Sequence, residues 1–152
     1  MKSFFSYVVT GVLAAFLSLA PFSVQSATPS NEPIDPAGVQ LEPQQQNGIT
    51  YVAGGIGLDE SRTLLQTKGY NLHMTFSVGP ENKYTSDVDL AIQNLQGKSV
   101  LTLNQVGPIV FVQLPAGKYQ VVATRDGHTE RNTVDMKAAG VRDLNLHWNE
   151  GS

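Results

Sequence analysis

The sequence predicts an all-β protein, a seven-stranded antiparallel β-sandwich preceded by one short α-helix. Between residues 70 and 149, apolar side chains recur at every second position, which is the period of a strand with one buried face. Turn-forming residues separate these runs at regular intervals, a spacing typical of stacked antiparallel sheets. The chain has no cysteine, so the domain must be stabilised by its core alone, for which about 100 ordered residues are sufficient.

The first 26 residues have the layout of a secretory signal peptide. Lys2 precedes a mostly apolar run over residues 4–22, and the side chains of Val24 and Ser26 favour cleavage after Ser26. The alternative is an uncleaved membrane anchor, although polar residues dilute the apolar run. A cleaved signal predicts an exported, periplasmic protein, and the lack of cysteine excludes attachment to lipid through an N-terminal cysteine.

Residues 27–50 are rich in proline, glutamine and asparagine and poor in large apolar side chains. Such a segment buries too little surface to offset its ordering entropy, which predicts a disordered linker; a docked partner-binding peptide is the alternative. Residues 51–69 follow as a glycine-rich turn and a short helix. The helix is expected from Leu58 to Lys68, because acidic residues suit its first turn and Gly69 suits its end.

Alternating apolar residues then predict strands over residues 70–78, 87–92, 99–106, 109–114, 118–124, 130–136 and 141–148. The run at 109–114 is uniformly apolar, which predicts burial on both faces of its strand. The run at 130–136 is polar enough for the edge of a sheet. Asp126 and Gly127, between two of the runs, are typical of a tight hairpin turn.

The segment Leu-Pro-Ala-Gly-Lys-Tyr-Gln-Val, residues 114–121, is predicted to form a corner between two strands. Pro115 fixes its backbone angle and ends the first strand, and Gly117 can adopt the positive φ that the turn requires. Tyr119 is expected to pack its ring inward with its hydroxyl near the rim, while Val121 follows on the same face. The residues of this fold corner are Leu114, Pro115, Gly117, Tyr119 and Val121.

The corner resembles the Leu-Pro-x-Gly-x-Tyr-x-Val signature of carboxypeptidase regulatory-like domains, which belong to the transthyretin-like, or prealbumin-like, group of β-sandwiches. The resemblance extends over residues 71–148, with Asn-Leu-Gln-Gly at 94–97 as a departure at one turn. It implies an exported bacterial protein with a transthyretin/Ig-like sandwich over residues 70–149. It also implies that the corner is structural and that the domain serves as an accessory or interaction module.

The residues that carry chemistry in other proteins show no convergent spacing here. His73, His128 and His147 are the only histidines, and no two of them have the close spacing of metal ligands, which predicts surface histidines. Asp87 and Asp89 are two positions apart on one predicted strand and face the same side. They could bind calcium or act as acid and base, but a solvated strand face is the preferred interpretation. We therefore expect no catalytic residue, no metal and no cofactor.

The charge of the chain bears on its partners. Ten Lys and Arg against 13 Asp and Glu give a net charge of −3, and the basic residues are scattered. This distribution gives no support to binding of nucleic acid or of anionic lipid. We expect an exported, non-catalytic binding or structural module of the cell envelope, with an unknown protein or envelope partner and no membrane contact after signal cleavage.

Two alternatives stay open at this point. One is a small periplasmic hydrolase, and the other is a subunit of a surface or secretion assembly that adds a partner to an exposed strand edge. Histidine and carboxylate side chains that converge in one pocket would favour the hydrolase. A flat sandwich with a bare edge would favour the assembly.

Overall fold

A computed structural model of the protein describes residues 41–150. The predicted signal peptide, residues 1–26, and residues 27–40 of the predicted linker lie outside the described residues. The described part contains ten strands and one helix, α1 (Leu58–Gln66). The strands are β1 (Gln44–Gln46), β2 (Ile49–Gly54), β3 (Leu72–Val78), β4 (Lys83–Tyr84), β5 (Val88–Asn94), β6 (Ser99–Val106), β7 (Ile109–Gln113), β8 (Gly117–Arg125), β9 (His128–Met136) and β10 (Arg142–Trp148).

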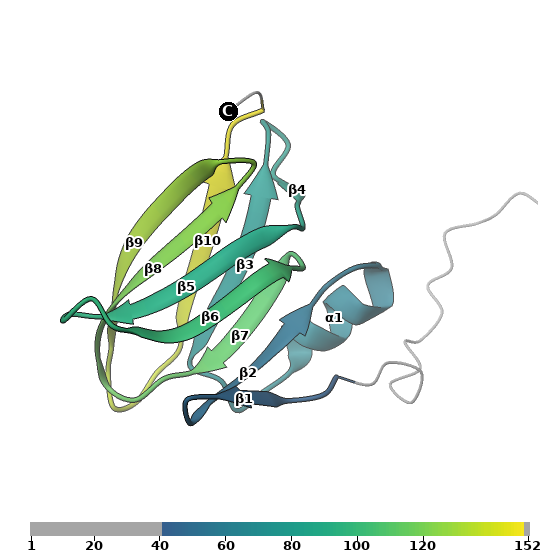
Figure 1. Ribbon diagram of the computed structural model, residues 1–152. Helices are drawn as coiled ribbons and strands as arrows, with labels where there is room; N and C mark the ends of the chain where they lie inside the picture. The colour runs from purple at the N-terminus through teal and green to yellow at the C-terminus, as the bar shows by residue number, and fades with distance from the viewer. Residues whose placement is uncertain (1–40, 151–152) are drawn as a thin grey trace, which may run out of the picture. The chain divides into compact units, whose positions relative to one another are not determined.

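The strands form two sheets that pack face to face, so the predicted β-sandwich is confirmed (Figure 1). Sheet A has the order β1-β2-β7-β3-β10, with β4 paired to the end of β3, and sheet B has the order β6-β5-β8-β9. The main core lies between the sheets, where alternate residues of their strands meet. Its fully buried side chains include Phe76, Leu72, Leu90, Ile92 and Leu101.

Two strands, β1 and β2, lie where the sequence predicts a linker and a turn. Asn47 and Gly48 have φ of 52° and 76°, so they form the tight turn that joins these strands in antiparallel pairing. β2 then pairs with β7 and buries Ile49 and Val52. The linker prediction is therefore wrong for residues 44–50, because pairing with neighbouring strands stabilises a sequence of weak intrinsic preference.

The number of strands also differs from the prediction. The seven predicted strands correspond to β3 and β5 through β10, while β1, β2 and β4 are additional. The segment 51–54, predicted as part of a turn, belongs to β2. The helix begins at Leu58, as the sequence predicts, but it ends at Gln66 rather than at Lys68. The strands β1 and β2 precede it, so it does not stand ahead of the sandwich.

The helix α1 covers the outer face of sheet A. Leu64 is buried there in a second apolar cluster with Val52, Tyr70, Ile109 and Phe111. β7 is consequently buried on both faces, as its uniformly apolar sequence predicts. Among residues 41–150, no helix is long and apolar enough to cross a bilayer.

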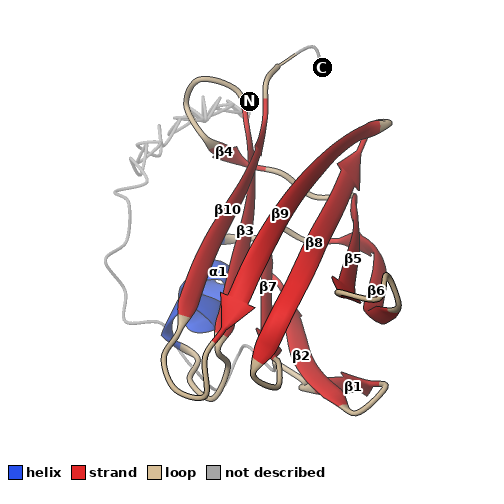
Figure 2. Ribbon diagram, turned by 90° about the vertical axis from the view of Figure 1, so that its left-hand side faces the viewer, coloured by secondary structure: helices blue, strands red, loops and turns tan. Residues whose placement is uncertain are grey.

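The expectation of a purely antiparallel sandwich is wrong at β10. This strand pairs with β3 in parallel, from Arg142 opposite Leu72 to Trp148 opposite Val78. After β9, at the edge of sheet B, the chain passes into sheet A and runs beside β3 in the same direction (Figure 2). Alternation of apolar residues identifies β10 as a strand but carries no information about the direction of its neighbour.

Candidate functional site

The predicted fold corner lies where β7 leaves sheet A and β8 enters sheet B. Leu114 and Val121 are buried in the main core, and the Tyr119 hydroxyl donates to Pro115 O at 2.9 Å. Burial raises the pKa of the Tyr119 phenol above its ordinary value, so the hydroxyl keeps its proton, and can donate, to a higher pH than usual. Gly117 has φ +151°, a backbone angle that residues with a side chain rarely adopt.

Asn71, just before β3, holds this corner from the side, and sequence reasoning missed it. Its side-chain amide donates to Leu114 O at 2.7 Å and accepts from Leu114 N at 2.8 Å. The amide thus pairs with the backbone of Leu114 as a neighbouring strand would. The two residues are far apart in the sequence, so the only available signal was a polar residue directly ahead of an apolar run.

We expect Gly117→Val to lower the free energy of unfolding by about 1–3 kcal/mol, because valine is strained at this φ. An added Cβ would lie 3.7 Å from the Tyr119 ring, an ordinary contact, so the cost comes from the backbone rather than from a collision. Lys118→Val introduces the same side chain at the exposed neighbouring position and should change stability by less than about 0.5 kcal/mol. Denaturant unfolding of both variants measures the difference. Equal midpoints would contradict the strain at Gly117.

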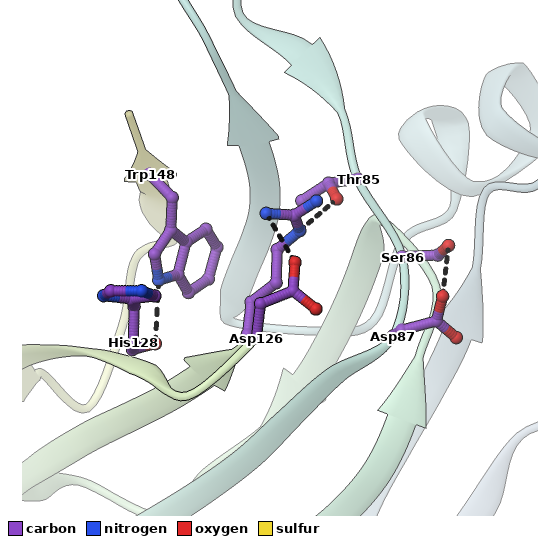
Figure 3. Close-up of polar contacts among 7 residues, drawn as sticks. Thr85, Ser86, Asp87, Asp126, His128 and Trp148 are labelled. Carbon is purple, nitrogen blue, oxygen red and sulfur yellow. Dashed lines mark hydrogen bonds and ion pairs between the residues drawn. The ribbon is translucent and has the colours of Figure 1, made fainter. Parts of the chain in front are cut away.

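The histidines do not converge. His128 begins β9 and is exposed, whereas His73 and His147 lie on β3 and β10. The backbone of His128 has a structural role, because its carbonyl accepts a hydrogen bond from Trp148 Nε1 at 3.0 Å (Figure 3). Within residues 41–150, no group of three or more histidine or acidic side chains is placed to hold a metal ion.

His73 and His147 differ from the predicted surface histidines because both are partly buried and have polar neighbours. His73 Nδ1 lies 3.2 Å from Asp143 Oδ1, and the ring stacks on Phe111 with centroids 3.9 Å apart. The His73 side chain is only 23% exposed, and its Nε2 is buried without a hydrogen-bond partner. The stacking partner comes from β7, which pairs with β3, so only the sheet order could have revealed it.

Ser77 and His147 form the nearest approach to a nucleophile and a base in this part of the chain. Ser77 Oγ lies 3.0 Å from His147 Nδ1 and 3.0 Å from Asn145 Oδ1. Ser77, however, is 1% exposed, so its hydroxyl is not accessible to a substrate. Among the described residues, no carboxylate pairs with His147 to orient it. This contact therefore ties β3 to β10 and does not form a catalytic site.

The predicted pairing of Asp87 and Asp89 on one strand face is wrong. Asp87 precedes β5 and has φ +59°, so its side chain departs from the alternation of the strand. It contacts the Ser86 hydroxyl at 3.5 Å (Figure 3). Asp89 Oδ1 instead accepts a hydrogen bond from the backbone N–H of Gln105, at 3.0 Å. The two carboxylates thus have separate partners.

A polar cluster at the start of β5 and the end of β8 also escaped sequence reasoning. Arg125 Nε donates to Thr85 Oγ1 at 2.7 Å, and its guanidinium lies 3.0 Å from Asp126 Oδ2 (Figure 3). The Arg125 side chain is 25% exposed, and Thr85 is buried. The Arg125 guanidinium thus contacts Thr85 through Nε and Asp126 through Nη1. These two contacts join the loop before β5 to the β8–β9 turn.

Two hollows on the surface lie beside the helix α1. One of about 420 Å³ lies beside α1 and is lined by His73, Asp143, Phe111 and Leu65, among others. It contains one histidine and one carboxylate, and these already contact each other. Another, of about 460 Å³, lies at the start of α1, where Ile56, Leu58 and Tyr84 expose apolar surface.

The edge of β6 in sheet B is covered by side chains. The Gln46 amide donates to Thr102 O at 3.0 Å and accepts from Thr102 N at 2.6 Å, so it takes the place of a neighbouring strand. Asn47 Nδ2 also donates to Val100 O, 3.3 Å away. The turn between β1 and β2 therefore blocks this edge against the addition of another strand.

The edge of β10 in sheet A is bare by comparison. Among the described residues β10 pairs with β3 alone. The Arg142 amide donates to Asn71 O and the Trp148 carbonyl accepts from Gly79 N, so alternate residues of β10 direct their backbone groups to β3. Backbone groups of the residues between them point to the other side. We call these the outward residues of β10: Asp143, Asn145 and His147.

Comparison with known proteins assigns no family. No family model matches the sequence, and no curated protein matches it significantly. Among solved structures, the major pilin subunit of Bacillus cereus is similar with a TM-score of 0.41 and 13% sequence identity, over 50% of this chain and 28% of that chain. The chain thus matches less than a third of the length of the pilin. A likeness of this size assigns no function, and the fold rests on the strand pairing described above.

Proposed function

We propose that the chain is an exported, non-catalytic interaction module of the cell envelope, related to the carboxypeptidase regulatory-like domains, and that β10 takes up a strand of a protein partner. The bare edge of β10 is the observation that carries this proposal. Within residues 41–150, the N–H and C=O groups of its outward residues have no strand partner along this seven-residue strand. Such a row is a template for addition of another strand.

The placement of the polar side chains supports a binding role over hydrolysis. His73, His147 and Ser77 have partners within sheet A, and Ser77 is inaccessible. Asp87 and Asp89 are occupied separately. A hydrolase needs a nucleophile or an activated water beside a base in an accessible pocket, and none of these contacts supplies one. The predicted leader, residues 1–26, supports export into the periplasm.

We expect Asn145→Pro to abolish capture of partners through β10, whereas Asn145→Ala should retain it. Proline removes the N–H that points away from β3, and it leaves the ladder between β3 and β10 intact. Alanine removes the same side chain, including its contact with Ser77, but keeps the N–H. The measurement is chemical crosslinking in intact envelopes, with adducts of any mass scored for the wild-type chain and both variants.

Thermal unfolding serves as the control, because both variants must remain folded for the comparison to count. Discrete adducts that survive Asn145→Ala and disappear with Asn145→Pro support strand addition at β10. The proposal fails if the wild-type chain forms no adducts. It also fails if the proline variant forms the same adducts as the wild type.

A further inference from the structure

The outward residues of β10 form a sequence that complements itself. Asp143 is acidic, His147 lies four positions later on the same face, and Asn145 stands midway between them. All three side chains project from the outer face of sheet A, because the residues between them turn towards the core. A strand with this pattern presents unlike groups to a reversed copy of itself.

We propose that the strand added to β10 is β10 of a second copy of this chain, antiparallel and centred on Asn145; this inference rests on the proposed function. A two-fold axis at Asn145 sets Asn145 opposite itself and Asp143 opposite His147 of the second copy, twice. The free N–H and C=O groups of each outward residue then meet those of an outward residue in the other copy. The two sheets A become one continuous sheet.

Other two-fold registers lose part of this match. An axis at Leu144 sets His147 opposite residue 141 of the second copy, which lies before the strand. An axis at Leu146 sets Asp143 opposite residue 149, which lies after it. An axis at Asp143 places two carboxylates face to face, which is destabilising in a cross-strand pair. The register centred on Asn145 keeps all outward residues paired within β10 and joins unlike groups.

The inner face of β10 is compatible with the same register. Leu146 is buried in the main core, and Leu144 is partly buried and packs against it. In the proposed pair, Leu144 of one copy stands opposite Leu146 of the other, so apolar side chains continue across the junction. Figure 2 looks onto the side of the sandwich that contains β10 and the neighbouring edge strand β9. β9 pairs with β8 along its length and contacts β10 through Trp148 and His128.

The test measures the mass of the purified chain, expressed at full length, by sedimentation over a range of protein concentrations. We expect a monomer–dimer equilibrium with a dissociation constant between about 1 µM and 1 mM, as suits a small interface. Asn145→Pro should weaken it at least about tenfold, because it removes the central hydrogen bonds from both copies. Asn145→Ala should change it less than about threefold.

A charge-reversal pair tests the register. Asp143→Lys places a cation opposite His147 of the second copy and should weaken the dimer, and adding His147→Glu should restore it. Loss of the contact between Asp143 and His73 within one chain cannot explain such a rescue. A wild-type chain that stays monomeric up to about 1 mM overturns the inference. So does a dimer that is insensitive to Asn145→Pro, or one that the double variant does not restore.

The outcomes separate this inference from the proposed function. Envelope adducts that contain only foreign proteins, together with a purified chain that stays monomeric, leave the interaction module standing and overturn self-pairing. The absence of any adduct from the wild-type chain overturns both.

Discussion

Trp148→Ala should lower the free energy of unfolding by about 3–5 kcal/mol, the largest effect we expect of a single substitution in this chain. Trp148 ends β10 and is 2% exposed. Its ring tilts against Phe76 with centroids 6.3 Å apart, and its indole N–H donates to His128 O across the two sheets. Alanine leaves a cavity between the sheets and removes the hydrogen bond from the indole to the backbone at the start of β9.

Trp148→Phe separates the two contributions. Phenylalanine keeps an aromatic ring beside Phe76 but cannot donate to His128 O, so we expect a loss of about 1–2 kcal/mol. The chain contains one tryptophan, so unfolding must be followed by circular dichroism rather than by intrinsic tryptophan fluorescence. A loss below about 1 kcal/mol for the alanine variant would contradict the placement of Trp148 in the core.

Asn71→Ala is expected to cost about 2–4 kcal/mol, because it leaves both backbone groups of Leu114 without partners. Leu114 is 2% exposed, so water cannot replace the amide at this position. The matched control is Gln46→Ala. It removes a side-chain amide that likewise makes two hydrogen bonds to one backbone, that of Thr102. Thr102 is exposed, so water takes over and the loss should be below about 1 kcal/mol.

Chemical denaturation of both variants gives the comparison. Equal losses would mean that the corner at Leu114 is hydrated, and would contradict the burial described for it. A larger loss for Asn71→Ala would identify Asn71 as the residue that fixes the end of β7 against β3.

The sequence was informative wherever structure depends on local pattern. Leu72, Met74 and Phe76 alternate with polar residues, and this alone predicts β3 and its buried face. The uniformly apolar run of β7 predicts that something covers its second face, which α1 does. Both inferences depend only on which consecutive residues are apolar and which are polar. Neither requires knowledge of the rest of the fold.

What the sequence could not supply depends on contacts between distant segments. The glutamine-rich β1 has no hydrophobic signal, and it is a strand because β2 pairs with it. Asn71 and Leu114 meet only after β3 and β7 have paired. The parallel direction of β10 and the stacking of His73 on Phe111 follow from sheet order, which alternation does not encode. The position of β10 at the edge of sheet A could not be predicted for the same reason.

The pairing of β3 with β10 also affects when the molecule can fold. β10 contacts β3 across roughly 70 residues of chain, and all of sheet B lies in sequence between the two strands. Closure of such a long loop costs entropy before any contact repays it, so folding is slow compared with a fold of local hairpins. Sheet A lacks β10 until residues 142–148 have been synthesised. During synthesis, β3 therefore waits longer for its second neighbour than either inner strand of sheet B, β5 or β8.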